Sequence, residues 1–237
     1  MDLKTYRAKQ AVQKQIASLS THRALCRKCR KASLTCYCKH IEPFTSKPQF
    51  VILIHPKENR KRVGTGRMTH LCISNSVLIE GVNFTNNDTV NQIIQNPGNW
   101  PVVLYPGKDA LDITKNARSK LEAFVPPNKK LVVIVIDGSW PCAKKMLKMS
   151  SNLQKLPQIC FVPPHRSIYQ IRRQPRDICF STVEAVHLII DQLGGKSQEH
   201  ENLLAVFRVM IAQQLDHVAR PGQRATRGAR SSNKARK

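Results

Sequence analysis

The sequence predicts an α/β domain built on a mostly parallel sheet. Short runs of aliphatic and β-branched residues recur along the chain without polar alternation, which is typical of strands buried on both faces. These runs cover residues 50–54, 102–105, 131–136 and 158–162. Helical patterns cover residues 65–74, 141–149, 181–193 and 203–218. Strands that alternate with helices in this way favour a parallel sheet with helical connections.

Two of these helices carry start signals. Ser181 and Glu184 have the spacing of a capping box, in which each side chain bonds the backbone of the other residue. Pro141 suits the first turn of a helix, and we expect Ser139 as the N-cap of that helix. A weakly amphipathic helix is also expected over residues 3–19. One helix therefore begins directly after the aliphatic run at 131–136.

The chain is strongly basic. Its 39 Lys and Arg residues outnumber 15 Asp and Glu residues, for a formal net charge of +24. Such self-repulsion favours a polyanionic partner, with nucleic acid ranked before an anionic membrane or a ribosome-like structural role. The longest aliphatic run is far shorter than the roughly 20 residues of a transmembrane helix. We see no signal peptide and no indication of an obligate protein partner, so we expect a cytoplasmic protein without a membrane partner.

The charge pattern divides the chain into three parts. We predict an N-terminal helix with a cysteine lobe over residues 1–47, a main domain over 48–217 and a disordered basic tail over 218–237. The tail has seven basic side chains and no acidic one. Within the main domain, positive charge is concentrated in residues 57–67 and 137–177. The folded body should therefore carry two basic windows.

Four cysteines are grouped within 13 residues, in the pattern C-x2-C-x6-C-x-C. Zn²⁺ prefers tetrahedral thiolate coordination, and two closely spaced pairs on turns can reach one ion. A redox pair and free thiols are the alternatives, although no strand precedes the first pair and the neighbouring Arg and Lys would make unligated thiols reactive. We predict a closed structural zinc site formed by Cys26, Cys29, Cys36 and Cys38. Small core residues are predicted at Cys72, Cys142, Cys160 and Cys179.

The aliphatic run at 131–136 is followed by Asp137-Gly138-Ser139-Trp140 and then by a basic helix. A carboxylate, a glycine, a hydroxyl and an aromatic ring thus follow a buried strand at its carboxyl end, where open α/β sheets bind ligands. A simple helix cap, with Trp140 packed in the core, is the structural alternative. These residues alone leave both interpretations open.

Several further motifs occur in a fixed order between residues 23 and 215. The series is Arg23-x2-Cys26-x2-Cys29, Cys36-x-Cys38, His55-Pro56-Lys57-Glu58, Gly64-Thr65, Tyr105-Pro106, Asp137-Gly138-Ser139-Trp140, Ser167-x-Tyr169-x-Ile171-Arg172 and Ser181-Thr182-Val183-Glu184-Ala185. On these motifs the chain resembles the DTW-domain family, the tRNA-uridine aminocarboxypropyltransferases. Two positions depart from the family pattern. Ser139 replaces the usual Thr and keeps its hydroxyl, and Ala32 replaces a usual Pro, which loosens a turn.

The resemblance implies a SPOUT-like α/β fold with a trefoil knot at the cofactor site. It implies S-adenosylmethionine as cofactor and tRNA as partner, beside the structural Zn²⁺ already predicted from the cysteine spacing. The implied reaction transfers the 3-amino-3-carboxypropyl group to N3 of a tRNA uridine and releases methylthioadenosine. A SPOUT-type RNA methyltransferase and a non-enzymatic zinc-containing RNA-binding protein are the alternatives.

The resemblance and the chemistry of the residues together predict which groups bind the cofactor and take part in the reaction. Asp137 is expected to act as general base for N3 or to hold the cofactor's amino group. Ser139 is expected to position a polar group, and Trp140 to stack on adenine or to face the sulfonium. Arg172 is the expected clamp for the cofactor carboxylate. The full set expected at the cofactor is His55, Pro56, Tyr105, Pro106, Gly107, Asp137, Gly138, Trp140, Ser167, Tyr169 and Arg172.

Two of the polar positions in these motifs also have plain structural interpretations. His55 can serve as a strand-end histidine, and Glu184 is expected only to cap its helix. The basic windows supply the expected RNA contacts, with a solvated loop as the alternative for the first window. These contacts are Arg60, Lys61, Arg62, Arg67, Lys144, Lys145, Lys148, Arg166, Arg173 and Arg176. The charge is therefore expected to form a basic rim around a cofactor pocket.

Overall fold

A computed structural model describes residues 25–61, 63–115, 123–169, 171, 179–193 and 198–219. The helix expected over residues 3–19 lies outside the described residues. The basic tail also lies outside them, apart from its first two residues, which continue the last helix. Both expectations therefore stay predictions.

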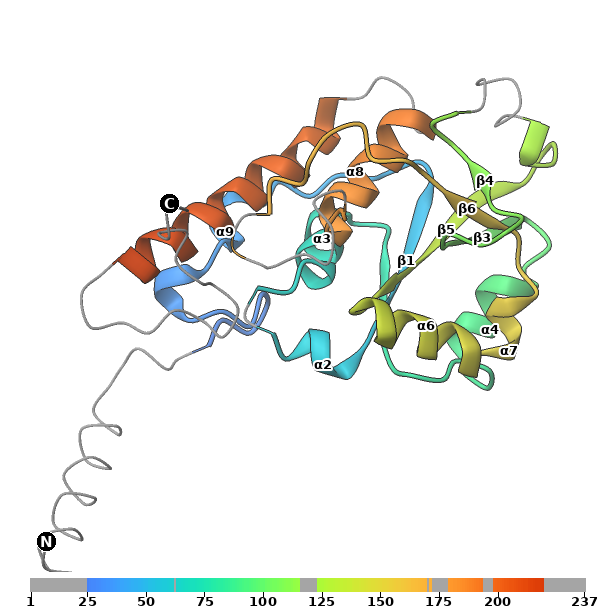
Figure 1. The fold of residues 1–237 in the computed structure, drawn as a ribbon, viewed down its shortest axis with the longest axis horizontal. Helices are drawn as coiled ribbons and strands as arrows, with labels where there is room; N and C mark the ends of the chain where they lie inside the picture. The colour runs from blue at the N-terminus through green and yellow to red at the C-terminus, as the bar shows by residue number, and fades with distance from the viewer. Residues whose placement is uncertain are drawn as a thin grey trace, which may run out of the picture.

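Within the described residues, six strands form one sheet (Figure 1). They are β1 (Gln49–Ile54), β2 (Val77–Glu80), β3 (Asn99–Leu104), β4 (Leu111–Asp112), β5 (Lys130–Asp137) and β6 (Gln158–Cys160). Their order across the sheet is β2-β1-β5-β3-β6-β4, and every neighbouring pair is parallel. The predicted α/β class with a parallel sheet is confirmed. The strand β5 is central, and its last residue pairs with the end of β1.

Helices cover both faces of this sheet (Figure 1). One face carries α4 (Asp88–Gln95), α6 (Trp140–Met149) and α7 (Ser151–Gln154), and the other carries α3 (Gly66–Cys72), α8 (Thr182–Leu193) and α9 (Glu201–Ala219). The short α2 (Pro56–Asn59) follows β1. Single 3-10 turns are η2 (Ser33–Thr35), η3 (Cys38–His40) and η4 (Gln198–His200). None of the helices in the described ranges is both long and apolar enough to cross a bilayer.

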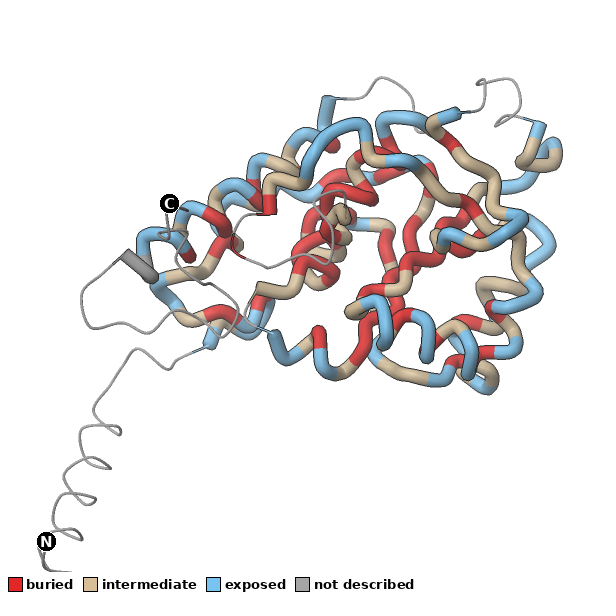
Figure 2. The backbone as a smooth tube through the Cα atoms, viewed as in Figure 1, coloured by how far each residue is buried: buried red, intermediate tan, exposed pale blue. Residues whose placement is uncertain are grey.

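The sheet separates two apolar clusters. Figure 2 shows the backbone of the central strands coloured as buried. Val133 and Val135 of β5 pack with Phe207 of α9, whereas Val132 and Ile134 face the cluster on the opposite side of the sheet. Both sides of each central strand are therefore buried. This explains why the aliphatic runs in the sequence lack polar alternation.

The four strands predicted from aliphatic runs are present, but two others were missed. The edge strand β2 is half-exposed and ends in an exposed glutamate, and β4 contains only two residues. Neither has the buried run that identified the central strands. The helix α4 was also missed, although Asn87 caps it by accepting a 3.0 Å hydrogen bond from the amide of Val90.

The cysteine lobe packs directly on the main domain. Cys29 and Tyr37 are buried in the same cluster as Phe207, and η2 contacts α9. The apolar interior is thus continuous between the lobe and the helical face of the sheet.

Candidate functional site

A cavity of about 760 Å³ opens at the carboxyl ends of β3, β5 and β6. Its remaining walls come from the loops that follow these strands, from the segment before α8 and from the first residues of α6 and α8. The lining residues are Leu104, Tyr105, Pro106, Val135, Ile136, Gly138, Trp140, Pro141, Ala143, Cys160, Phe161, Pro163, Cys179, Phe180, Ser181, Thr182 and Ala185. This is the edge at which parallel α/β sheets bind ligands, and the volume suits one small molecule.

Aromatic rings line two sides of the cavity. Tyr105 and Trp140 meet edge to face, with ring centroids 6.4 Å apart. Phe161 and Phe180 form a second, tilted pair at 5.7 Å. Trp140 is 47% exposed, so the alternative in which it packs into the core is wrong. A flat, largely apolar ligand with one polar end matches these walls.

Asp137 lies beside the cavity and not on its surface. As the last residue of β5 it is buried, and its Oδ1 accepts a 2.5 Å hydrogen bond from the hydroxyl of Thr182, which does line the cavity. Its backbone carbonyl accepts a 2.9 Å bond from the amide of His55. Thr182 therefore connects the Asp137 carboxylate to the wall of the cavity.

Gly66, the first residue of α3, is packed against this carboxylate. A Cβ on Gly66 would lie 2.3 Å from Oδ2 of Asp137, a distance that no real Cβ contact shows. A glycine is needed here because any side chain would displace the aspartate. Sequence reasoning did not identify this requirement, since Gly66 and Asp137 are 71 positions apart in the chain.

The rest of the motif after β5 lies around the start of α6. Gly138 lines the cavity, and Ser139 holds the predicted N-cap position of α6. The Ser139 side chain is half-buried and makes no capping hydrogen bond within the described structure. Its hydroxyl is therefore not used by the helix.

Glu184 does more than the predicted capping. The capping box is present, since Glu184 Oε2 accepts from the amide of Ser181 at 2.8 Å and from its hydroxyl at 2.7 Å. The same buried carboxylate also accepts from the hydroxyl of Ser167 and from the amide of Ile168, each at 2.8 Å. Glu184 thereby joins the segment at 167–169 to the cavity edge at Ser181. Ser167, expected at the cofactor, is bound to this carboxylate and is absent from the cavity lining.

Tyr169, another expected cofactor residue, is used in packing. Its hydroxyl donates to the carbonyl of Val63, and its ring meets Phe207 edge to face at 5.1 Å. It is buried and does not line the cavity. Arg172, the expected carboxylate clamp, lies outside the described residues, as do Arg62, Arg173 and Arg176.

The loop after β1 also lies off the cavity lining. His55 is buried and caps α2, because its Nδ1 accepts a 3.1 Å hydrogen bond from the amide of Lys57. Pro56 starts the same helix. Burial lowers the pKa of His55, and the charges of Lys57, Lys145 and Lys61 lower it further although Glu58 raises it. Gly107 adjoins the cavity residue Pro106, and its backbone lies against the Gln158 side chain.

The predicted basic windows converge near this loop. Lys61 from the first window and Lys145 from the second both act electrostatically on His55. Of the predicted RNA contacts, those that are both described and exposed are Arg60, Lys61, Lys144, Lys145, Lys148 and Arg166. Three of these lysines lie on α6, whose first residues line the cavity.

Arg67 differs from these exposed cations. Its Nη2 donates a 2.7 Å hydrogen bond to Oδ1 of Asn59, and the side chain of Asn59 in turn donates to Glu80. Arg67 is half-buried, and burial is the main cause that lowers its pKa. This arginine therefore joins α3 to α2.

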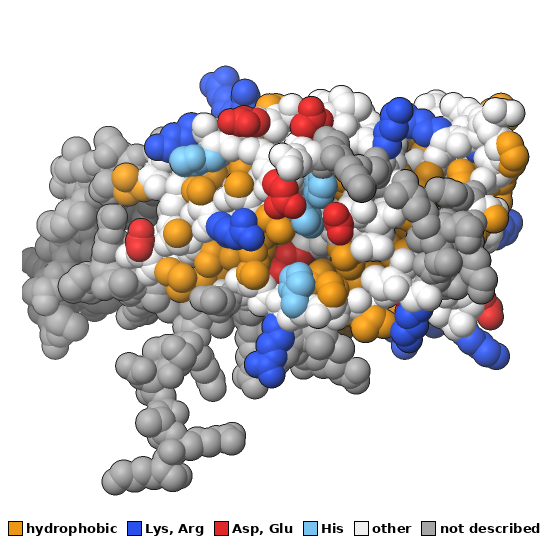
Figure 3. Space-filling view, turned by 90° about the horizontal axis from the view of Figure 1, so that it is seen from above, with side chains coloured by type: hydrophobic (Ala, Val, Ile, Leu, Met, Phe, Trp, Pro, Cys, Tyr) orange, Lys and Arg blue, Asp and Glu red, His pale blue; other side chains and the backbone are white. Residues whose placement is uncertain are grey.

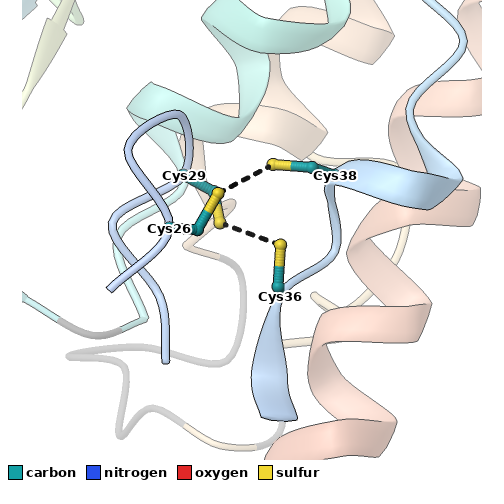
Figure 4. Close-up of side chains that lie close together, drawn as sticks. All are labelled: Cys26, Cys29, Cys36 and Cys38. Carbon is teal, nitrogen blue, oxygen red and sulfur yellow. Dashed lines mark hydrogen bonds between the residues drawn. The ribbon is translucent and has the colours of Figure 1, made fainter. Parts of the chain in front are cut away.

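The four clustered cysteines have the geometry of a tetrahedral metal site (Figure 4). Their sulfurs point toward one another and all lie within 4.8 Å, with 3.8 Å between Cys26 and Cys38 and 3.6 Å between Cys29 and Cys36. Zn–S bonds of about 2.3 Å in a tetrahedron would separate the sulfurs by roughly 3.8 Å. These residues fit the zinc ion predicted from the spacing.

The backbone favours the thiolate form of Cys26, whereas burial raises the pKa of Cys29 and of Cys38. The amides of Cys29 and Lys28 lower the pKa of Cys26 to about 6, mainly through the Cys29 hydrogen bond. Arg30 adopts a left-handed conformation with φ of 58°, and its amide bonds the carbonyl of Cys26 at 2.8 Å. This tight turn places the first two sulfurs on the same side of the loop.

The four other cysteines do not all behave as core residues. Cys72 is buried as predicted, whereas Cys142, Cys160 and Cys179 are half-buried. Cys160 and Cys179 line the cavity, because one ends β6 and the other precedes α8.

Comparison with known proteins decides the family. The model of the DTW domain matches residues 23–215, which include the cysteine cluster, the cavity and most of α9. The chain belongs to the DTW-domain family. No solved structure matches the chain.

Curated relatives of this DTW protein are named tRNA-uridine aminocarboxypropyltransferase 2. The Drosophila melanogaster protein is 27% identical over 201 residues, which cover 82% of this chain and 76% of that relative. The Mus musculus and Macaca fascicularis proteins are 25% and 26% identical, and each alignment covers 82% of this chain. The chain spans only 64% of each of these two mammalian relatives.

The structure adds residues that the sequence analysis of this DTW protein missed. Phe161 follows β6, so the rule that ligands bind at strand ends could have found it. Phe180 lies just before α8, and Thr182 is the first residue of that helix. The nearest preceding strand, β6, ends 20 residues before Phe180. No local pattern indicated that these two residues line the cavity.

Proposed function

We propose that this protein transfers the 3-amino-3-carboxypropyl group of S-adenosylmethionine to N3 of a uridine in tRNA, releasing methylthioadenosine. In this reaction N3 loses its proton and bonds to the aminocarboxypropyl carbon that is attached to sulfur. The bond between that carbon and sulfur breaks, and the sulfur leaves as part of methylthioadenosine. One observation carries the proposal: in a chain of the DTW family, the cavity at the strand ends is bordered by Asp137, Gly138 and Trp140. The names of the curated relatives agree with it.

The cavity fits the proposed donor. S-adenosylmethionine supplies a sulfonium with electrophilic carbons next to an adenosine. Trp140 and Tyr105 would hold the adenine or the sulfonium, since aromatic faces attract both rings and cations. Thr182 positions Asp137, and the aspartate would take the N3 proton or hold the amino group of the donor. Selection among the three carbons would follow from how these residues orient the sulfonium.

We further propose that the chain has the SPOUT-like arrangement with a trefoil knot at this cavity. The support is the parallel sheet and the contribution of the segments after β5 and β6 to one ligand space. Zn²⁺ on the four cysteines would be structural, because four protein ligands leave no open coordination position.

Analysis of the modified nucleosides tests the reaction. The full-length protein is incubated with tRNA and S-adenosylmethionine, and the digested tRNA is examined by mass spectrometry together with the released small molecule. An aminocarboxypropyl uridine with methylthioadenosine supports the proposal. A methyl adduct would show a methyltransferase instead, and tRNA binding without any adduct would show a non-enzymatic RNA-binding protein.

The tRNA interaction is tested through its salt dependence. Neutralising one side chain that binds a phosphate should reduce the slope of log affinity against log salt by roughly 0.7–0.9. The double variant Lys144→Gln/Lys148→Gln should therefore lower the slope by about 1.5. A matched control, Lys129→Gln/Lys130→Gln, removes two exposed charges at the amino end of β5, outside both basic windows. Equal slopes for the two variants would show that the lysines of α6 do not contact the tRNA.

A further inference from the structure

Two histidines and a carboxylate meet where α8, η4 and α9 come together. His187 lies in α8, His200 ends η4 and Glu201 begins α9. One nitrogen or oxygen from each of these three side chains lies within 4.8 Å of the others. Figure 3 shows histidine and acidic side chains side by side on the face seen from above. None of these residues belongs to the cavity lining or to the cysteine cluster.

The distances within this group suit metal ligands. Nε2 of His187 lies 3.1 Å from Oε1 of Glu201, and Nε2 of His200 lies 3.9 Å from the same oxygen. Metal–nitrogen and metal–oxygen bonds of about 2.1 Å in a tetrahedron would separate the ligand atoms by roughly 3.4 Å. Oδ1 of Asp191, one turn after His187 in α8, is 4.0 Å from Nε2 of His200. This exposed carboxylate or a water molecule would complete the four ligands.

The state of His200 indicates that the group is more than a surface ion pair. Its side chain is only 7% exposed, yet within the described structure neither ring nitrogen makes a hydrogen bond. A buried polar atom without a hydrogen bond is costly, and burial of such atoms is usually compensated. Nε2 of His200 is directed toward Glu201 and Asp191. An ion bound there would supply the missing partner.

We propose that His187, His200 and Glu201 bind a second Zn²⁺ ion, distinct from the ion of the cysteine cluster. Two imidazoles and a carboxylate are ligands that Zn²⁺ accepts. The exposed carboxylates give the ion access from solvent, with Glu201 59% and Asp191 57% exposed. The ion would join the middle of α8 to the start of α9, and thus hold together two helices on the same face of the sheet.

Zinc binding to the full-length protein, prepared without a histidine tag and with its cysteine site loaded, tests this site. Titration calorimetry should detect a second equivalent of Zn²⁺ per chain. His187→Gln and Glu201→Gln should each weaken that second equivalent by at least about 100-fold, because the loss of an outer-shell partner alone costs roughly 10–100-fold. Asp216→Asn, which removes an exposed carboxylate elsewhere on α9, should leave it unchanged. Since His187 and Glu201 are less buried than His200, these variants avoid the risk of misfolding that His200→Ala carries.

Cobalt supplies a second readout that does not depend on affinity. The second equivalent of Co²⁺ should show tetrahedral visible bands without thiolate charge transfer, because its ligands are nitrogen and oxygen. A second equivalent with thiolate charge transfer would place it on cysteines and overturn the proposal. No Zn²⁺ binding beyond the ion already loaded on the cysteines, or equal affinity in His187→Gln and the wild type, would overturn it as well.

Discussion

The cysteine cluster and the cavity at the strand ends are built in opposite ways. The cluster takes all its ligands from 13 consecutive residues, and its sulfurs already lie at tetrahedral spacing. The cavity collects its walls from the ends of three strands and the starts of two helices, between Leu104 and Ala185. A local site depends on its ligands, whereas a site assembled from distant segments depends on the packing behind it. Variants in the two regions should therefore fail in different ways.

The largest effect is expected from the cluster. Cys29 is buried in the apolar cluster shared with α9, so Cys29→Ser should remove a zinc ligand and destabilise the helical face together. We expect a loss of about 4 kcal/mol or more in the free energy of unfolding, because metal binding and folding are coupled in such sites. Chelator should lower the melting temperature of the wild type and have little further effect on the variant. Cys142→Ser, outside the cluster, should behave as the wild type, and an equal loss there would contradict a structural metal.

Substitutions at the cavity should lower the transfer activity and leave the fold intact. Asp137→Asn keeps the shape of the side chain and an oxygen for Thr182, so the protein should fold and bind tRNA nearly as the wild type does. Transfer should fall by roughly 10²–10⁴-fold, the usual contribution of a group that moves or holds a proton. Asp88→Asn, on α4, serves as control. Turnover close to that of the wild type would exclude Asp137 from the mechanism.

Gly66→Ala tests the packing behind the cavity. The new Cβ must displace the Asp137 carboxylate, because it would lie 2.3 Å from Oδ2. Overpacking of this kind costs about 1–3 kcal/mol, and transfer should fall as the aspartate moves. At Gly98 the same substitution meets only the exposed Asn96 side chain at 3.3 Å, so Gly98→Ala should change stability and transfer far less. Similar results for the two alanine variants would refute the proposed dependence on Asp137 placement.

Trp140→Ala should give the smallest effect. Because this side chain is 47% exposed, its removal should change the free energy of unfolding by less than about 1 kcal/mol. The affinity for S-adenosylmethionine should fall by about 10-fold, within the range of stacking and cation–π contacts, and Trp140→Phe should restore most of it. Met149→Ala, an exposed apolar residue at the other end of α6, should leave the affinity unchanged. An unchanged affinity of Trp140→Ala for S-adenosylmethionine would show that this ring does not contact the cofactor.

The same contrast explains what could be predicted from the sequence. Central strands, the cysteine site and the capping box at Ser181 depend on near neighbours, and the patterns that encode them identified all three. The contact between Gly66 and Asp137 depends on the way α3 packs against the end of β5. Glu184 was predicted as a cap, but its bonds to Ser167 and Ile168 depend on where that segment folds back. Tertiary packing set these contacts, and no local pattern records them.

A structure of the protein with bound S-adenosylmethionine tests the central claim most directly. We predict the ligand in the cavity at the ends of β3, β5 and β6, with its aromatic ring or sulfonium against Trp140. The carboxypropyl carbon next to sulfur, and not the methyl group, should face the open side where the uridine enters. A ligand bound elsewhere on the chain, or one that presents its methyl group to the open side, would contradict the account.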